Sequence, residues 1–372
     1  MEEIKYNIHV TTKNMSFVKM VAILKQEKVE NNKFFLALFD ESLENLDPYD
    51  PNLSYEIKQR IFKECTLNYW YFLREIVRIP IQGSNIPYKM YELHKGNLAL
   101  NFCVINNLNT ILELPTYGYK DISVLCRILW EFLFGTKYLN TSFIDKSFEK
   151  NQLDLTKFKD LRKLLPSYLR MEKGIIFKAM TNHKDYKEKL LNNLNHNKII
   201  CIPSGNTKQK SEIVARGLTQ PRQCYFDLVN INNIDILLSE EKLKIFNDII
   251  KQVSEKDKNP YGIIATTFSG DKRIPSQKYV FDLMNSGIKF DDTWYDKSVE
   301  DIKDMVSKKS SNSFVHIRYT YKQLYFSQEW YLQISRSLND DKETIKKSVL
   351  LEWIEDNLTY ERISIMDDLK IL

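Results

Sequence analysis

Residues 110–121 read Thr110-Ile-Leu-Glu-Leu-Pro-Thr-Tyr-Gly-Tyr-Lys120-Asp121, and a strong helical pattern follows over residues 122–134. The first five residues are an apolar run of strand length. Strand, loop, lysine and helix is the order of a phosphate-binding loop. In such a loop, backbone N–H groups and a helix N-terminus face the phosphates while the lysine neutralises them. The stretch therefore predicts a phosphate-binding loop formed by Thr116, Tyr117, Gly118, Tyr119, Lys120 and Asp121.

This loop departs from the usual ending, which is Gly-Lys-Thr or Gly-Lys-Ser. The glycine lets the backbone approach the phosphate, and the hydroxyl binds magnesium. Here Tyr119 precedes the lysine and Asp121 follows it. Taken alone, the loop is better explained as a plain strand-to-helix turn with a solvated Lys120.

The rest of the chain alternates between short apolar runs and helical patterns, which is typical of a mainly parallel α/β sheet. We expect further strands at residues 141–144, 198–202, 223–227, 261–267 and 314–321. We expect helices at residues 54–65, 68–79, 92–106, 153–165, 228–252, 328–338 and 341–353. Gly and Pro number only ten each, which favours long helices and regular strands.

Two later strand ends carry side chains suited to nucleotide chemistry. Asp227 ends the expected strand 223–227, where a P-loop NTPase holds its magnesium. The residue after that Asp is normally a Glu that activates water, and here it is Leu228. Thr266 and Thr267 end the expected strand 261–267, where hydroxyl groups can sense a γ-phosphate. Parallel strands meet at one edge, so these residues predict a single site.

Composition excludes several other classes of protein. The 372 residues are 43% hydrophobic and 28% charged, so most of the chain is not disordered. A net charge of +5 permits contact with nucleic acid without requiring it. The five cysteines form no CxxC motif and the five histidines show no ligand spacing, which argues against a metal site and favours reduced, buried thiols. The most apolar stretch, residues 122–134, is too short to span a bilayer.

Two further features have ordinary structural interpretations. The aromatic run Tyr69-Trp-Tyr-Phe72 is expected to pack in the core and lid rather than to stack on bases, and His94 is expected to make local hydrogen bonds. Lysine-rich stretches such as residues 184–189 are solvated helix faces or, alternatively, face DNA.

Several segments together resemble the N-terminal ATPase half of phage terminase large subunits, the DNA-packaging motors of T4-like and crAss-like phages. They occur in collinear order over residues 34–356. The segments are Asp47-Pro-Tyr-Asp-Pro-Asn-Leu53, Asn68-Tyr-Trp-Tyr-Phe-Leu-Arg-Glu75, Leu93-His-Lys-Gly-Asn-Leu-Ala99, Leu112-Glu-Leu-Pro115, Trp130-Glu-Phe-Leu-Phe-Gly135, Leu164-Leu-Pro-Ser-Tyr-Leu-Arg-Met171, Arg216-Gly-Leu-Thr-Gln-Pro221, Ala265-Thr-Thr267, Ser269-Gly-Asp271 and Ser348-Val-Leu-Leu-Glu-Trp353.

The resemblance implies an ASCE-type P-loop NTPase fold with a small helical lid built from the N- and C-terminal segments. We expect a helical subdomain over residues 1–95, the NTPase-like core over 96–295, and a strand-helix segment with a tail over 296–372. It further implies ATP and magnesium as cofactors. Lys120 matches the phosphate-loop lysine, Asp227 the magnesium-organising Asp, and Thr266 and Thr267 the coupling motif. Either Arg162 or Arg170 could match a transition-state arginine.

The implied partners are the phage portal or other packaging and virion proteins, and double-stranded DNA, with the chain assembled as a ring of identical subunits. The implied location is the host cytoplasm during phage assembly, or the virion itself. No membrane partner is expected.

The departures from the family pattern leave three hypotheses open. The altered loop, the Leu228 position and the expected absence of a nuclease half favour a pseudo-ATPase that keeps the scaffold as an interaction protein. The alternatives are a divergent but active packaging ATPase whose nuclease is on a separate chain, and an unrelated nucleic-acid-processing NTPase. The sequence predicts weak or lost ATP binding and assigns no catalytic residue.

Overall fold

A single mixed sheet forms the centre of the protein. The computed structural model describes residues 12–81, 88–116, 120–134, 140–144, 148–170, 196–201, 211–216, 228–254 and 262–355. The strands of this sheet are β3 (Asn109–Glu113), β4 (Asn140–Ile144), β5 (His196–Cys201), β6 (Ser211–Arg216), β7 (Leu228–Ile231), β8 (Gly262–Thr267), β9 (Ile288–Lys289) and β10 (Phe314–Arg318). Their spatial order is β5-β6-β4-β7-β8-β3-β10-β9.

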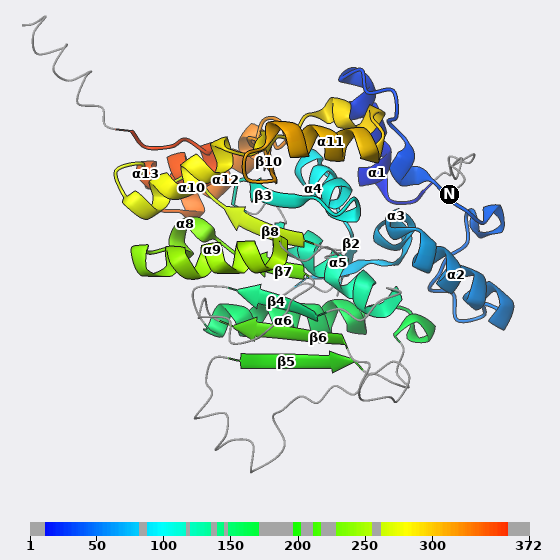
Figure 1. Ribbon diagram of the computed structural model, residues 1–372. Coiled ribbons are helices and arrows are strands. Elements are labelled where there is room, and N and C mark those ends of the chain that lie inside the picture. Colours follow the sequence, from blue (N-terminus) through cyan, green and yellow to red (C-terminus); the bar gives the residue numbers. More distant parts are fainter. Residues whose placement is uncertain are drawn as a thin grey trace, which may run out of the picture.

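The sheet is parallel except at one edge, where β5 pairs antiparallel with β6. Figure 1 shows the strands rising from β5 at the bottom to β10 at the top. Strand β3 lies in the interior of the sheet, between β8 and β10. The predicted fold class, an α/β fold with a mainly parallel sheet flanked by helices, is confirmed.

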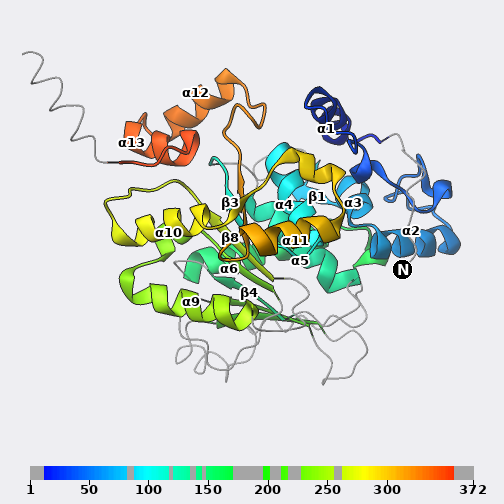
Figure 2. The ribbon, with the colours of Figure 1, turned by 45° about the horizontal axis from the view of Figure 1, so that its top comes forward.

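Helices cover both faces of this sheet (Figures 1 and 2). The longer helices are α1 (Met15–Gln26), α2 (Tyr55–Leu67), α4 (Lys95–Ile105), α5 (Lys120–Phe134), α6 (Phe148–Lys163), α9 (Glu240–Ser254), α10 (Pro275–Asn285), α11 (Val299–Lys309) and α12 (Gln328–Ser337). The short elements are α3 (Tyr69–Tyr71), η3 (Phe72–Ile76), α8 (Ile234–Leu237), η5 (Asp292–Asp296), α13 (Lys342–Ile345), η6 (Lys346–Leu350), η1 (Phe34–Leu36), η2 (Glu41–Leu43), η4 (Ser167–Leu169) and the hairpin strands β1 (Arg78–Pro80) and β2 (Tyr88–Met90).

Alternation along the strands divides the interior into two cores. Leu112, Ile264 and Val315 face a large core shared with α4, α5, α6, α11 and the N-terminal helices. Ile111 and Ala265, on the opposite face of the same strands, pack with α8, α9 and α10. Successive side chains of a strand point to opposite faces, so continuous apolar runs are the sequence of a sheet that is covered on both sides.

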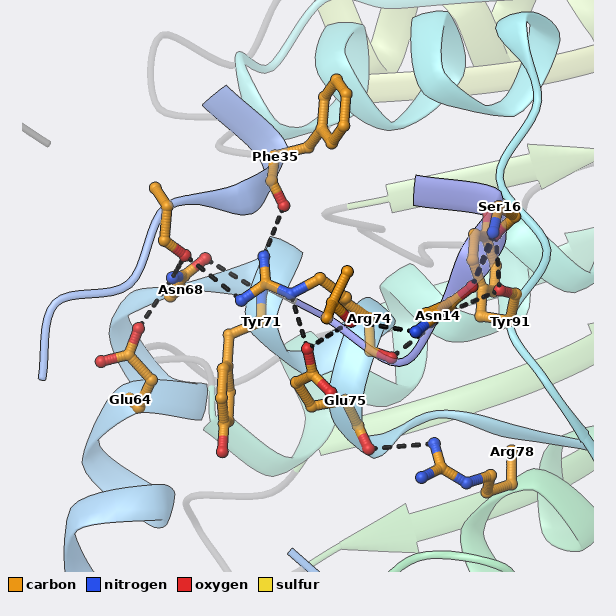
Figure 3. A network of polar contacts seen from close by, with 12 residues as sticks. Asn14, Ser16, Phe35, Glu64, Asn68, Tyr71, Arg74, Glu75, Arg78 and Tyr91 are labelled. Carbon is orange, nitrogen blue, oxygen red and sulfur yellow. Dashed lines mark hydrogen bonds and ion pairs between the residues drawn. The ribbon is translucent and has the colours of Figure 1, made fainter. Parts of the chain in front are cut away.

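The N-terminal region is held by a buried arginine (Figure 3). Arg74 is fully buried, and its guanidinium donates hydrogen bonds to the carbonyl oxygens of Phe35 (2.6 Å) and Ala37 (3.5 Å). Its Nε pairs with the Glu75 carboxylate at 2.8 Å. One side chain therefore connects η3 to the segment that follows α1.

The aromatic run beside Arg74 packs as predicted. Tyr69, Tyr71 and Phe72 are buried, and Phe72 is in edge-to-face contact with Phe134 of α5. The predicted helix 68–79 ends early, at Ile76, because the chain turns there into strand β1.

His94 makes local hydrogen bonds as predicted. It caps α4 by accepting a hydrogen bond from the Asn97 backbone N–H at 3.3 Å, while the Asn97 side chain accepts one from the His94 N–H at 2.8 Å. This reciprocal capping starts the helix at Lys95 rather than at residue 92.

The cysteines that the structure places are also consistent with the sequence. Cys65, Cys103 and Cys126 are buried free thiols, and burial raises the pKa of each above its ordinary value. Such thiols are poor nucleophiles because the thiolate form is disfavoured.

Candidate functional site

The carboxyl ends of the parallel strands β10, β3, β8 and β7 meet at one edge of the sheet, on the left in Figure 1. Open α/β sheets bind their ligands at this edge. The predicted site residues are therefore expected to lie at this edge.

The predicted phosphate loop has the expected setting. Strand β3 ends at Glu113, and α5 begins at Lys120, so Lys120 opens a helix that follows an interior strand, as predicted. The positive end of the α5 dipole and its first backbone N–H groups lie at this edge. Tyr117, Gly118 and Tyr119, together with the side chains of Lys120 and Asp121, lie outside the described residues.

The entrance to that loop is tied to the C-terminal part of the chain. The backbone N–H of Thr116, which is half-buried, donates a hydrogen bond to the Ser348 carbonyl oxygen at 2.7 Å. Thr116 therefore meets a segment more than two hundred positions later, a contact that no local sequence pattern reveals.

Thr266 and Thr267 lie at the carboxyl end of β8, as predicted, and pair in register with Leu112 and Glu113 of β3. Both side chains are fully buried. The Thr266 hydroxyl accepts a hydrogen bond from the Asn233 backbone N–H at 3.0 Å, and the Thr267 hydroxyl bonds to an Asp235 carboxylate oxygen at 3.2 Å. The two threonines therefore connect β8 to the chain that follows β7.

The structure corrects the expected position of the second motif. Asp227 lies outside the described residues, but Leu228, expected just after a strand end, is instead the first residue of β7 and is buried. The run Leu228–Ile231 pairs with β8 from Gly262 onward, so the parallel register sets the carboxyl end of β7 at Ile231. The residues that follow this end are Asn232 and Asn233.

These two asparagines occupy a constrained turn. The Asn232 backbone N–H donates to the Ile144 carbonyl oxygen at 2.8 Å, and the Asn232 side-chain oxygen accepts from the Asn230 amide at 3.0 Å. Asn233 has φ 52°, a left-handed conformation that Asn tolerates better than most residues. The nearest carboxylate along the chain is Asp235, whose Oδ1 also accepts from the Phe268 backbone N–H at 3.1 Å.

The sequence analysis assigned no role to Glu113, the last residue of β3. Its carboxylate is fully buried and accepts hydrogen bonds from Ser269 Oγ at 2.6 Å and Trp353 Nε1 at 3.2 Å. His316 Nε2 lies at 3.2 Å and Arg318 Nε at 3.3 Å from its Oε2. Burial raises the pKa of Glu113, but the His316 hydrogen bond and the charges of His316 and Arg318 outweigh it and lower that pKa. The sequence did contain one sign of this buried site, because Glu113 is a charged residue inside an otherwise apolar strand.

The C-terminal segment 348–354 crosses this edge of the sheet. The Arg318 guanidinium donates to the Leu351 carbonyl oxygen, and the Ile354 N–H donates to the Gly270 carbonyl oxygen at 2.9 Å. Together with the Thr116 and Trp353 contacts, these bonds join the segment to β3, to β10 and to the turn after β8. The predicted helix 341–353 therefore ends at Leu350, and Leu351 adopts φ 58°.

The two side chains that directly follow β7 are not the usual ligands of magnesium. Mg²⁺ is usually bound through one or two carboxylates and several waters, whereas β7 is followed by two neutral amides. Within the described part of the chain, no three His, Cys, Asp or Glu side chains are placed to hold a metal ion.

The described helices include none that is long and apolar enough to cross a bilayer.

The two arginines considered as transition-state residues lie together at the end of α6. Arg162 donates to the Arg170 carbonyl oxygen at 2.9 Å, and Arg170 Nε donates to the Leu165 carbonyl oxygen at 2.7 Å. Both therefore bond to backbone carbonyls of this local turn.

Comparison with known proteins gives similarity in structure only. No protein-family model and no curated protein sequence matches the chain. The large terminase of a thermophilic bacteriophage is similar over 70% of this chain and 53% of its own, with 9% identity and a TM-score of 0.41. The Thermus phage P74-26 large terminase ATPase domain is similar over 71% and 95%, with 12% identity and a TM-score of 0.41.

The HK97 bacteriophage large terminase is similar over 80% of this chain and 55% of its own, with 10% identity and a TM-score of 0.43. This chain thus spans about half the length of the thermophilic bacteriophage and HK97 terminases. The terminase of the thermophilic bacteriophage has also been solved with ATP-γ-S and with ADP. These three solved structures are large terminases of phages or the ATPase domain of one.

Proposed function

We propose that this chain is a terminase-like pseudo-ATPase, which keeps the packaging-ATPase fold as a scaffold or interaction protein but does not hydrolyse ATP. The observation that carries the proposal is the pair Asn232 and Asn233 directly after the carboxyl end of β7. P-loop ATPases require a carboxylate at this strand end to organise magnesium. An amide is neutral, so it neither attracts the metal strongly nor accepts a proton from water.

Phosphate binding is better supported than hydrolysis. The fifteen-residue helix α5 begins at Lys120 and offers a positive end to an anion. Tyr119 and Asp121 oppose this, because the first adds bulk where the family has Gly and the second adds negative charge where the family has a hydroxyl. We therefore propose that ATP binds weakly or not at all, and that magnesium adds little to its binding.

The partners follow from the same proposal. The chain would act with the phage portal or other packaging and virion proteins, beside double-stranded DNA, in the host cytoplasm during assembly or in the virion. We propose that the chain assembles there as a ring of identical subunits.

One observation favours the alternative, a divergent but active ATPase with its nuclease on another chain. Asp235 is a buried carboxylate whose Oδ1 lies 3.2 Å from the Thr267 hydroxyl. Asp235 lies two residues after Asn233, the position of the missing base, and could replace that base if the turn at Asn233 rearranges. Asp235→Asn separates the two proposals, because it abolishes turnover only if Asp235 acts in hydrolysis.

The test is an ATPase assay with double-stranded DNA and magnesium. Loss of a general base commonly costs about 10²–10⁴-fold in rate, so we expect no turnover by the unchanged chain. Robust turnover that Asp235→Asn removes would establish the divergent motor instead. A variant combining Tyr119→Gly, Asp121→Thr, Asn232→Asp and Asn233→Glu is expected to gain ATP binding, measured by calorimetry, if the scaffold retains the nucleotide site.

A further inference from the structure

A concave site lies at the opposite edge of the sheet, where the strands begin. It is a cavity of about 280 Å³ between α3, the C-terminal halves of α4 and α5, and η5. Ile105 and Asn106, at the end of α4, lie just before β3 and so mark this as the amino edge, on the right in Figure 1 beside α3. Its aromatic lining consists of Phe34, Phe39, Tyr69, Trp70, Phe102, Trp130 and Tyr295.

The aromatic rings that line the cavity pack against one another. Phe34 is in edge-to-face contact with Trp70 at a centroid distance of 5.4 Å, and Tyr69 with Trp130 at 5.4 Å. Phe102 meets Tyr295 at 5.0 Å in the same way. Because these contacts join rings from five separate elements, the walls of the cavity are fixed before any ligand arrives.

The polar groups of the lining are directed into the protein. The side-chain amides of Asn31, Asn68 and Asn106 donate to the carbonyl oxygens of Tyr295, Ala37 and Phe102, each at 2.9 Å. The Trp130 indole N–H donates to the Cys65 carbonyl oxygen at 2.6 Å. These N–H groups already donate to backbone carbonyl oxygens of the protein. The surface that the cavity presents to an occupant is therefore mainly aromatic.

The described residues that line the cavity carry charge of one sign only, which is positive. Among the described residues that form it, Lys297, which is exposed, is the single charged one, and no Asp or Glu contributes. Leu67 contributes to the same wall and is 57% exposed. Lys63, also exposed, precedes Leu67 by one helical turn and so lies on the same face of α2. A partner that fits this surface presents an apolar group beside a negative charge.

The size of the cavity suits an aromatic side chain rather than a whole cofactor. Sites for whole cofactors or drug-sized ligands are usually about 300–1,000 Å³, and this cavity falls just below that range. We propose that it is a docking pocket for one aromatic side chain of a partner polypeptide, followed in that partner by an acidic residue that faces Lys297. Buried aromatic anchors of this kind carry most of the free energy of many protein–protein contacts.

A nucleic acid is a poorer fit to the same surface. Single-stranded nucleic acid is held by a groove with several cations along its backbone, and the described residues of this lining supply one. Reading a base also needs free donors and acceptors, whereas the lining amides already bond to backbone carbonyls.

The experiment uses the full chain and a capped six-residue peptide in which 4-fluorophenylalanine is followed by Glu. Binding is measured by fluorine NMR line broadening, without nucleotide, so the result does not depend on the proposed pseudo-ATPase function. We expect saturable binding of the fluorinated peptide, and binding several-fold weaker when its Glu is replaced by Lys. The peptide with Ala in place of the ring carries no fluorine, so its affinity is measured by competition with the fluorinated peptide and should be at least tenfold weaker. No saturable binding at millimolar peptide, or equal binding of the Ala peptide, would overturn the proposal.

Matched variants locate the site. Lys297→Gln should weaken binding several-fold and remove its salt dependence, whereas Lys303→Gln, an exposed lysine of α11, should not. Leu67→Ser should weaken binding, whereas Leu332→Ser, at a leucine 46% exposed on α12, should leave it unchanged. Equal effects within either pair contradict the assignment, and so does a ten-residue oligothymidylate that displaces the peptide.

Discussion

The indole N–H of Trp353 donates a hydrogen bond to the Glu113 carboxylate at 3.2 Å, across 240 positions of sequence. The contact joins the last residue of the interior strand β3 to the segment that crosses the carboxyl edge of the sheet. The Glu113 carboxylate also accepts a hydrogen bond from Ser269 and pairs with His316 and Arg318. One buried carboxylate therefore contacts donors from three parts of the chain.

Glu113→Ala should therefore destabilise the protein strongly. Removing one partner of a buried ion pair leaves the other charge uncompensated and commonly costs about 3–5 kcal/mol. Urea unfolding followed by circular dichroism measures the change. Trp353→Phe is the matched comparison, because it removes one neutral donor and should cost about 1 kcal/mol. Equal losses in the two variants would show that Glu113 does not hold the cluster.

Asp271 should make stability depend on acid pH. The Arg273 side chain hydrogen-bonds to its carboxylate and lowers the pKa of Asp271 to about 2. A folded-state pKa below the unfolded value gives stability that is present above about pH 4 and is lost as the pH falls through 2. Because Arg273 is half exposed, we expect Asp271→Asn to lower the free energy of unfolding by only about 1 kcal/mol at pH 6.

The check is a pair of urea titrations at pH 6 and pH 3. The difference in free energy of unfolding between the Asp271→Asn variant and the unchanged chain should be smaller at pH 3 than at pH 6. A difference that widens there would contradict the sign of the pKa shift.

Leu228→Glu should prevent stable folding. Leu228 is fully buried in the large core at the start of β7, so the new carboxylate would have no water and no assigned partner. We expect a loss of more than about 4 kcal/mol. Asn232→Asp retains the oxygen that accepts from Asn230 and should cost far less. Thermal unfolding distinguishes the two variants. A Leu228→Glu protein that folds stably would contradict the placement of Leu228 in the buried part of β7.

Arg74→Lys should destabilise the N-terminal region although the charge is kept. Lysine presents one ammonium group and cannot reach Phe35, Ala37 and Glu75 in the planar geometry that Arg74 uses. We expect a loss of about 2–3 kcal/mol. Arg60→Lys is the control, because Arg60 is exposed and its pairing with Asp40 is loose at 3.5 Å. Hydrogen exchange of residues 34–39 should rise only in the first variant.

The sequence predicted the fold class well because the signals were local. The strand before Lys120, the helix after it, the local hydrogen bonds of His94 and the threonines that end β8 all depend on residues close together in sequence. The strand end expected at Asp227 was wrong because apolar residues lie on both sides of this Asp, and only pairing with β8 shows that the strand continues to Ile231.

The residues around Glu113 could not be predicted in this way. Ser269, His316 and Trp353 reach it only after β8 and β10 have joined β3 on either side. The aromatic cavity is similar, since Phe34, Trp130 and Tyr295 come from segments with no common pattern. Clusters that depend on long-range pairing leave no periodic trace in the sequence.

Both neighbours of β3 in the sheet, β8 and β10, follow it in sequence. As the chain leaves the ribosome, β3 is therefore made before either strand that will cover its edges, and β4 to β7 are made in between. Contacts of such long separation slow folding, and an apolar strand that waits unpaired invites association with other chains. Nascent chains of this protein should consequently depend on chaperone binding between the synthesis of β3 and that of β10.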